Sequence, residues 1–392
     1  KAEVLDTYAD IAAAYGDSLS TAKTLQAAVD ELIANPSAEA LEAAKAAWLE
    51  ARVPYQQTEA YRFGNAIVDD WEGKVNAWPL DEGLIDYVDA SYGGATDENE
   101  YAVLNVIANP TFTLSGEEVD AAAITPELLE STLHEADAVE ANVATGYHAI
   151  EFLLWGQDLH GTGPGAGERP ASDYIEGQGG TGGHNDRRRA YLKAVTQLLI
   201  SDLEEMVNNW KPGVADNYRA TLEAEPAESG LRKMLFGMGS LSLGELAGER
   251  MKVALEANSS EDEHDCFSDN THNSHFYNGL GIRNVYLGEY TRVDGSKVSG
   301  ASLSSLVAKA DAATDATLRA DLDDTQAKLQ VIVDHANKGE HFDQLIAAGN
   351  TAGNQVVRDA IGALVKQTGA IEQAAGKLGI TDLNPDNADH EF

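Results

Sequence analysis

Cysteine is almost absent from the sequence, since Cys266 is the only one. A disulfide within the chain, a redox site of two cysteines and a multi-cysteine zinc cluster are therefore excluded. Basic residues are also few: 27 lysines and arginines stand against 65 aspartates and glutamates, a formal net charge of −38. Such a charge repels phosphate backbones and favours cations, so we expect no nucleic-acid partner.

Long hydrophobic runs are missing as well. No run approaches the roughly 18 apolar residues that a membrane-spanning helix needs, so we expect no membrane span. The hydrophobic fraction of 43% is that of a folded globular protein, and 392 residues favour two domains. The first residue is Lys1 and not methionine, which suggests that a leader or a tag preceded it. Export would explain this start, although a trimmed chain would look the same.

Helical periodicity dominates both ends of the chain. Apolar residues recur at spacings of three and four, for example between Leu25 and Ile33, which is typical of a helix with one buried face. Ser37 is the expected N-cap of the following helix. Strand-like alternation is rare. The sequence therefore predicts an all-α fold, with further helices over residues 187–210, 318–336, 342–348 and 356–378.

Breaks in this pattern indicate the domain organisation. Between residues 156 and 185, ten of thirty residues are glycine, which predicts a long surface loop that is exposed and protease-sensitive. Prolines and glycine interrupt the helices again near residues 212–230. We place a boundary there, between an N-terminal helical domain, 1–220, and a C-terminal one, 221–392. Two bundle-like halves would suit a duplication, but no fixed-period repeat supports it.

The sharpest candidate for chemistry is the segment Thr145–Gly156. At 100° per residue, His148 and Glu151 lie about 60° apart on one face of an otherwise apolar helix. A buried imidazole and carboxylate are costly unless they are paired or bind a cation. Zinc or iron would suit the imidazole and harder ions the carboxylate, and Gly146 would let another helix approach closely. A structural hydrogen bond between His148 and Glu151 is the alternative.

A second polar group follows in the C-terminal half. It places three soft or borderline ligands, His264, Cys266 and His272, within nine residues, a density that could bind a transition metal. The spacing matches no standard zinc motif, and an acidic helix-capping loop is the plainer interpretation. Arg283 could line the same cleft. The full group is Glu256, Glu261, Asp262, Glu263, His264, Asp265, Cys266, Asp269 and His272.

Several of these segments resemble a known family. "GYHAIEFLLWGQD" around His148 resembles the G-x-H-x-x-E signature of the imelysin-like proteins, the insulin-cleaving membrane peptidase family. "ARVPYQQTEAYRFG" (51–64) and "NAWPLDEGLIDYV" (76–88) extend the similarity. "EDEHDCFSDNTH" (261–272) and "GIRNVYLGEY" (281–290) resemble the iron-regulated protein A branch. The resemblance implies two helical domains with a polar site near their interface, in an exported bacterial protein tied to iron acquisition.

The resemblance also implies roles for individual residues. The motif positions fall on Gly146, His148 and Glu151. Glu59 and Asp81 lie in matching segments and could complete a mixed nitrogen and oxygen shell around a divalent or ferric ion, iron or zinc. Because a ligating histidine must be neutral, we expect metal affinity to fall below about pH 6.5.

Three functions follow as hypotheses. The leading one is a periplasmic or outer-membrane-associated protein that binds a metal ion or an iron-bearing ligand and has a partner protein in the envelope. The alternative is a metallopeptidase, in which Glu151 would act as the base; no catalytic residue is otherwise assigned, and the chain lacks an H-E-x-x-H motif. The third is a protein-binding module of the cell envelope.

Overall fold

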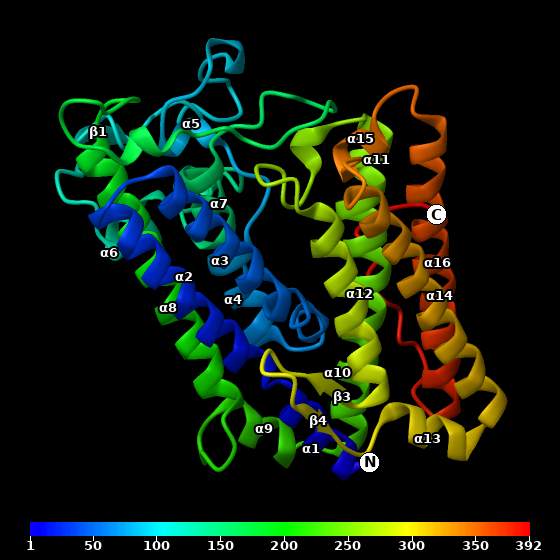
Figure 1. Cartoon of the computed structure of the whole chain (residues 1–392). Coiled ribbons are helices and arrows are strands. Elements are labelled where there is room, and N and C mark those ends of the chain that lie inside the picture. Colours follow the sequence, from blue (N-terminus) through cyan, green and yellow to red (C-terminus); the bar gives the residue numbers. More distant parts are fainter.

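The computed structural model describes all 392 residues and confirms the all-α prediction (Figure 1). None of its helices combines the length and the apolar character needed to cross a bilayer. The helices of the first half are α1 (Ala2–Ile11), α2 (Ala14–Ala34), α3 (Ala38–Gln56), α4 (Ala66–Asn76), α5 (Glu82–Ile85), α6 (Pro126–Leu128), α7 (Gly146–Trp155), α8 (Asn185–Trp210) and α9 (Tyr218–Ala224).

The second half begins with an almost unbroken helical run, in which a π-helical segment, Leu241–Lys252, joins α10 to α11. Two small antiparallel hairpins, β1–β2 and β3–β4, are the only sheets. The remaining elements are α10 (Ala227–Ser240), α11 (Val253–Ala257), α12 (Thr271–Leu287), α13 (Leu303–Ala310), α14 (Ala312–Ala336), α15 (Phe342–Ile346), α16 (Thr351–Lys377), β1 (Thr111–Leu114), β2 (Glu117–Asp120), β3 (Glu289–Thr291) and β4 (Lys297–Ser299).

Two groups of helices lie side by side (Figure 1). In the first group, α2 packs on α3 and α8, and α7 packs on the same two helices. In the second group, α14 packs on α12 and α16, and the π-helical segment packs on α16. Helix α3 meets α12 where the groups face each other. A core of 77 buried residues draws on both groups, and a smaller core of 13 lies within the second. The domain boundary near 212–230 stays a prediction.

Local sequence explains how α3 is built and placed. The Ser37 hydroxyl accepts a hydrogen bond from the backbone N–H of Ala40 at 3.0 Å, which confirms the predicted N-cap. Ala44, Trp48 and Tyr55 recur at helical spacing, and all three are fully buried. The face of α3 that carries these residues is directed toward the interior. Polar residues on the same face of α3 are therefore buried as well.

The Gly-rich segment departs in part from its prediction. Residues 176–184 are exposed, but Arg169 and Asp173 are buried. Arg169 donates to Asp86 at 3.0 Å and to Asp173 at 2.9 Å. Arg188 of α8 donates to both oxygens of Asp86, at 2.7 and 2.9 Å. The expectation of an exposed loop is therefore wrong around Arg169, because buried ion pairs tie that part to α8.

Limited proteolysis should cut first within residues 176–184, because this glycine-rich backbone is exposed whereas the preceding part is anchored. Mass spectrometry of the earliest fragments measures the position of the cut. A first cut between residues 169 and 174 would show that the ion pairs do not hold the segment in place.

Replacing Asp86 should destabilise the protein strongly. Asp86→Ala leaves two buried guanidinium groups short of a partner, and breaking a buried ion pair in this way costs about 3–5 kcal/mol in the free energy of unfolding. Urea denaturation measures the loss. Glu228→Ala, which removes only an exposed pair with Lys1, is the control and should leave the midpoint nearly unchanged. Similar midpoints for the two variants would contradict this role of Asp86.

Candidate functional site

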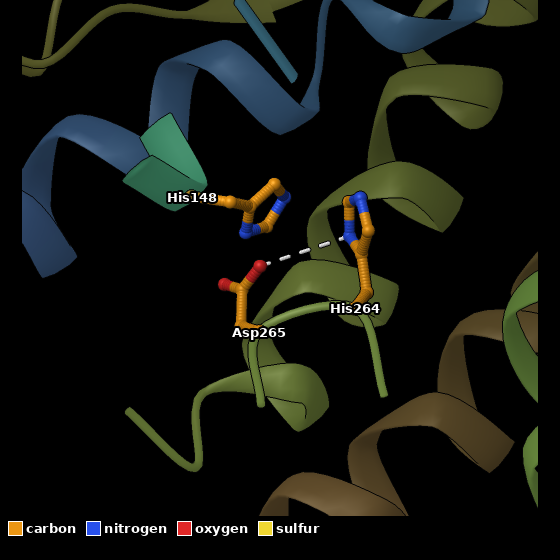
Figure 2. Close-up of side chains that lie close together, drawn as sticks. All are labelled: His148, His264 and Asp265. Carbon is orange, nitrogen blue, oxygen red and sulfur yellow. Dashed lines mark ion pairs between the residues drawn. The ribbon is translucent and has the colours of Figure 1, made fainter. Parts of the chain in front are cut away.

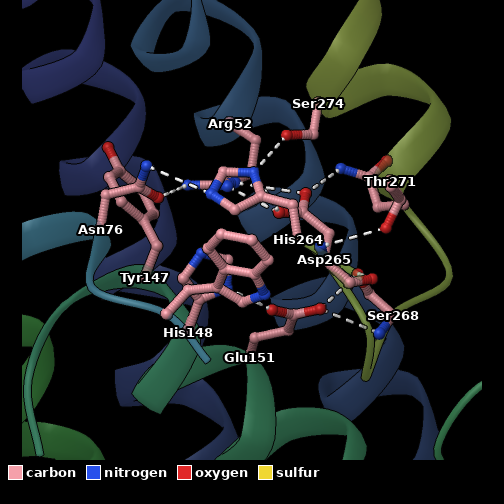
Figure 3. Close-up of polar contacts among 12 residues, drawn as sticks. Arg52, Asn76, Tyr147, His148, Glu151, His264, Asp265, Ser268, Thr271 and Ser274 are labelled. Atoms are coloured by element: carbon pink, nitrogen blue, oxygen red, sulfur yellow. Dashed lines mark hydrogen bonds and ion pairs between the residues drawn. The ribbon is translucent and has the colours of Figure 1, made fainter. Parts of the chain in front are cut away.

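Helix α7 carries the motif residues, and every one of its side chains is buried. Gly146 at its start has a φ of +83°, and a Cβ there would collide with the carbonyl oxygen of Val75 at the end of α4. Only glycine lets the two helices approach in this way. His148 and Glu151 lie on one face of α7, with His148 Nδ1 2.8 Å from Glu151 Oε2 (Figure 3).

The other nitrogen of His148 is left without a partner. His148 Nε2 makes no hydrogen bond, although the residue is only 2% exposed. Glu151 Oε1 accepts hydrogen bonds from the backbone N–H and the hydroxyl of Ser268, at 2.9 and 2.7 Å. A carboxylate that holds one ring nitrogen and leaves the second free is the usual way of orienting a metal-ligating histidine.

A second imidazole, from His264 in the segment between α11 and α12, lies beside the first, with 4.9 Å between the ring centroids. His264 Nδ1 is 2.6 Å from the Ser274 hydroxyl, and Nε2 is 3.4 Å from Asn76 Nδ2. Since Asn76 Oδ1 accepts a hydrogen bond from Arg52 at 2.7 Å, its amide presents NH₂ to the ring. Nε2 of His264 is therefore the acceptor, and Nδ1 carries the proton.

Asp265 completes the group. One ligand atom each from His148, His264 and Asp265 lies within 4.8 Å of the others (Figure 2). Arg52 donates to the two oxygens of Asp265 at 2.6 and 3.3 Å, and Asn270 donates at 2.7 Å. Burial alone would raise the pKa of Asp265, but the Arg52 charge outweighs it and holds the pKa below its usual range. Asp265 is therefore ionised at neutral pH.

Burial controls the protonation of the remaining groups. It lowers the pKa of His148 to about 3, with Arg52 adding to the effect, and it lowers the pKa of His264 well below its usual value. Burial, followed by the Asp265 charge, raises the pKa of Glu151 well above its usual value. Both imidazoles are thus neutral at pH 7, the form that binds a metal. We therefore expect protons to compete for His148 near pH 3, below the pH of about 6.5 expected from the sequence.

Glu59 and Asp81 are not among the side chains gathered around His148. Glu59 accepts hydrogen bonds from Arg250 at 2.6 Å and from Tyr55 at 2.9 Å. Asp81 accepts one from Asn99 at 2.6 Å. These partners satisfy both carboxylates without a metal ion.

The other candidates are divided between different places. Arg283 pairs with Asp323 at 2.9 Å on a partly exposed side of α12 and does not line the pocket of the two imidazoles. Cys266 lines a small pocket together with His148 and His264. The other lining residues of this pocket are Trp78, Leu80, Glu261, Glu263 and Phe267. Of these two candidates, only Cys266 therefore lines the pocket that contains His148.

Asp269 and His272 lie at a separate group of acids. One oxygen each of Asp158, Asp269 and Asp343 lies within 4.8 Å of the others. The His272 ring packs against the ring of His341, with centroids 5.4 Å apart. The 261–272 segment therefore contributes to two separate groups of side chains, one at His148 and one at Asp158 and Asp343. The sequence had led us to expect a single cleft.

Sequence reasoning missed Arg52 and Asn76 and did not single out Asp265 within its polar group. Arg52 carried a usable signal, because it lies on the same predicted helix as the apolar Trp48 and Tyr55. A buried arginine requires an acidic partner. Nothing in the spacing of Asp265 or Asn76 indicated that they meet His264.

Comparisons with known proteins agree with this fold. A family model described as imelysin matches residues 11–371. An iron-regulated protein A precursor from Parabacteroides distasonis ATCC 8503 has a similar structure, with a TM-score of 0.67 and 20% identity over 95% of this chain and 94% of its own. An imelysin-like protein from Psychrobacter arcticum 273-4 gives a TM-score of 0.61 and 16% identity over 97% of each chain. At such low sequence identities, these two similarities support a shared fold only. No curated protein matches significantly. Because the family model spans most of its residues, the chain belongs to the imelysin family.

Proposed function

We propose that the protein binds a metal ion, iron or zinc, at His148, His264 and Asp265, between the two groups of helices. The observation that carries this proposal is the buried, unpartnered Nε2 of His148. A buried polar atom without a partner costs free energy, which a bound cation would recover. Two histidines and one carboxylate form a ligand set that suits both iron(II) and zinc.

Each of the three ligands has a neighbour that holds it in place. Glu151 holds His148 through Nδ1, Ser274 holds His264 through Nδ1, and Arg52 holds Asp265. Such neighbours fix the ring orientation and the tautomer of a ligand. A bound ion would act as a Lewis acid on any group that entered the site.

The wider properties of the chain support a role in iron acquisition. Its net charge of −38 raises the local concentration of cations. One similar structure is described as an iron-regulated protein A precursor. On this basis we propose an exported protein, periplasmic or attached to the outer membrane, that carries a metal ion or an iron-bearing ligand and meets a partner protein of the envelope.

A metallopeptidase is the second candidate, because Glu151 lies beside the three ligands without being one of them. A carboxylate in that position could act as the base for a metal-bound water, because His264 and Asp265 would supply the ligands that α7 alone lacks. The pocket at His148 opposes this function, since it has room for only about one water molecule. A peptide could not reach the site in this arrangement, and metal binding without turnover is the better supported function.

Removing the motif histidine should abolish binding at this site. His148→Ala, purified without an affinity tag, should take up no zinc ion there, whereas the wild type takes up one. Elemental analysis and calorimetric titration with Zn²⁺ measure this difference. Glu151→Gln should weaken binding by about 10- to 100-fold, because it disturbs the group that orients the ligand.

The matched control is His184→Ala, which removes an exposed histidine of the Gly-rich segment and should bind zinc as the wild type does. Wild-type protein that takes up neither Zn²⁺ nor Fe²⁺ near neutral pH would sink the proposal. Chelator-sensitive proteolysis by pure protein that is lost in Glu151→Gln would instead favour the peptidase.

The protonation of His148 offers an independent test. Because burial lowers its pKa to about 3, its ring should stay neutral at pH 5, where an ordinary histidine with a pKa of about 6.5 is mostly charged. Nitrogen chemical shifts of the histidine rings in the metal-free protein measure this, and His148→Ala assigns the signal. A ring that titrates near pH 6.5 would show that the site is open to water.

A further inference from the structure

A second group of carboxylates lies at the far end of the 261–272 segment. Asp158 follows α7, Asp269 lies in the segment itself, and Asp343 lies in α15. One oxygen from each lies within 4.8 Å of the other two. The three residues are 7%, 5% and 0% exposed, respectively. Three parts of the chain therefore bring like charges together inside the protein.

These carboxylates lack the partners that other buried acids have. Both oxygens of Asp343, Oδ2 of Asp158 and Oδ1 of Asp269 make no hydrogen bond. By contrast, Asp265 is held by the buried Arg52. Like charges at this separation in the interior need a proton or a cation to persist. Burial, and then the neighbouring carboxylate, raise the pKa values of Asp269 and Asp343 to about 7.

Glu263 belongs to the same segment but not to this group of three acids. It is fully buried, neither of its carboxylate oxygens has a hydrogen-bond partner, and it lines the pocket that contains His148 and His264. His341 of the neighbouring chain segment does contact the group, with Nδ1 3.1 Å from the backbone carbonyl oxygen of Asp269.

We propose that Asp158, Asp269 and Asp343 bind a hard divalent cation, of the class of Ca²⁺ or Mn²⁺, in a site separate from the His148 group. Carboxylate oxygens are the ligands that such ions prefer. Ligands of Ca²⁺ lie about 2.3–2.6 Å from the ion, so oxygens that lie within 4.8 Å of one another can reach the same ion. The ion would join α15 and the end of α7 to the 261–272 segment. This proposal does not depend on the proposed function.

The test uses the full chain after treatment with EDTA. At pH 8, above the pKa of about 7 of Asp269 and Asp343, the wild type should bind one Mn²⁺, measured by electron paramagnetic resonance, and added Ca²⁺ should displace it and raise the melting temperature. Asp343→Asn should weaken Mn²⁺ binding by at least about tenfold, because affinity follows the number of charged ligands. His148→Ala should bind Mn²⁺ here as the wild type does.

Asp321→Asn is the matched control, since Asp321 is also buried but pairs with Lys366 at 2.7 Å. It should leave Mn²⁺ binding unchanged. Asp158→Asn replaces Asp343→Asn if the latter does not fold. Wild-type protein that takes up neither Mn²⁺ nor Ca²⁺ would overturn this site while leaving zinc binding at His148 untouched. Equal Mn²⁺ affinity in the wild type and in a folded Asp343→Asn or Asp158→Asn variant would overturn it as well.

Discussion

The buried guanidinium of Arg52 is the charge on which the arrangement around His148 depends. Arg52 lies on α3 and is 1% exposed, so it must be paired where it stands. Its pair with Asp265 fastens the 261–272 segment to α3. Its hydrogen bond to Asn76 orients the amide that faces His264 and thereby makes Nε2 the accepting nitrogen of that ring. The single side chain of Arg52 thus orients side chains from three parts of the chain.

The 261–272 segment contributes to two groups of side chains because it is irregular. His264 and Asp265 turn toward His148, whereas Asp269 turns toward Asp158 and Asp343. A regular helix or strand would place neighbouring side chains on faces fixed by its period. Because the segment has no such period, residues close together in it can point to different groups. Any displacement of the segment would therefore alter both groups together.

The surface stays strongly acidic, although more acids than basic residues are buried. The chain has only 27 lysines and arginines, and several arginines are used inside, where they balance buried carboxylates. A surface with so few cations leaves its acids largely unopposed, which attracts metal ions from solution. The buried arginines are Arg52, Arg169, Arg188, Arg219 and Arg250.

The sequence by itself determined the helices, the N-cap at Ser37 and the position of His148 and Glu151 on one face of α7, because all of these follow from the spacing of residues close together in the chain. Only the tertiary structure decided which distant residues meet them. Ser268 reaches Glu151 across 117 positions, and Glu59, which the sequence also offered as a ligand, is taken by Arg250. Burial explains the difference, since a buried charge must find a partner and the choice depends on how the helices pack, which no local spacing records.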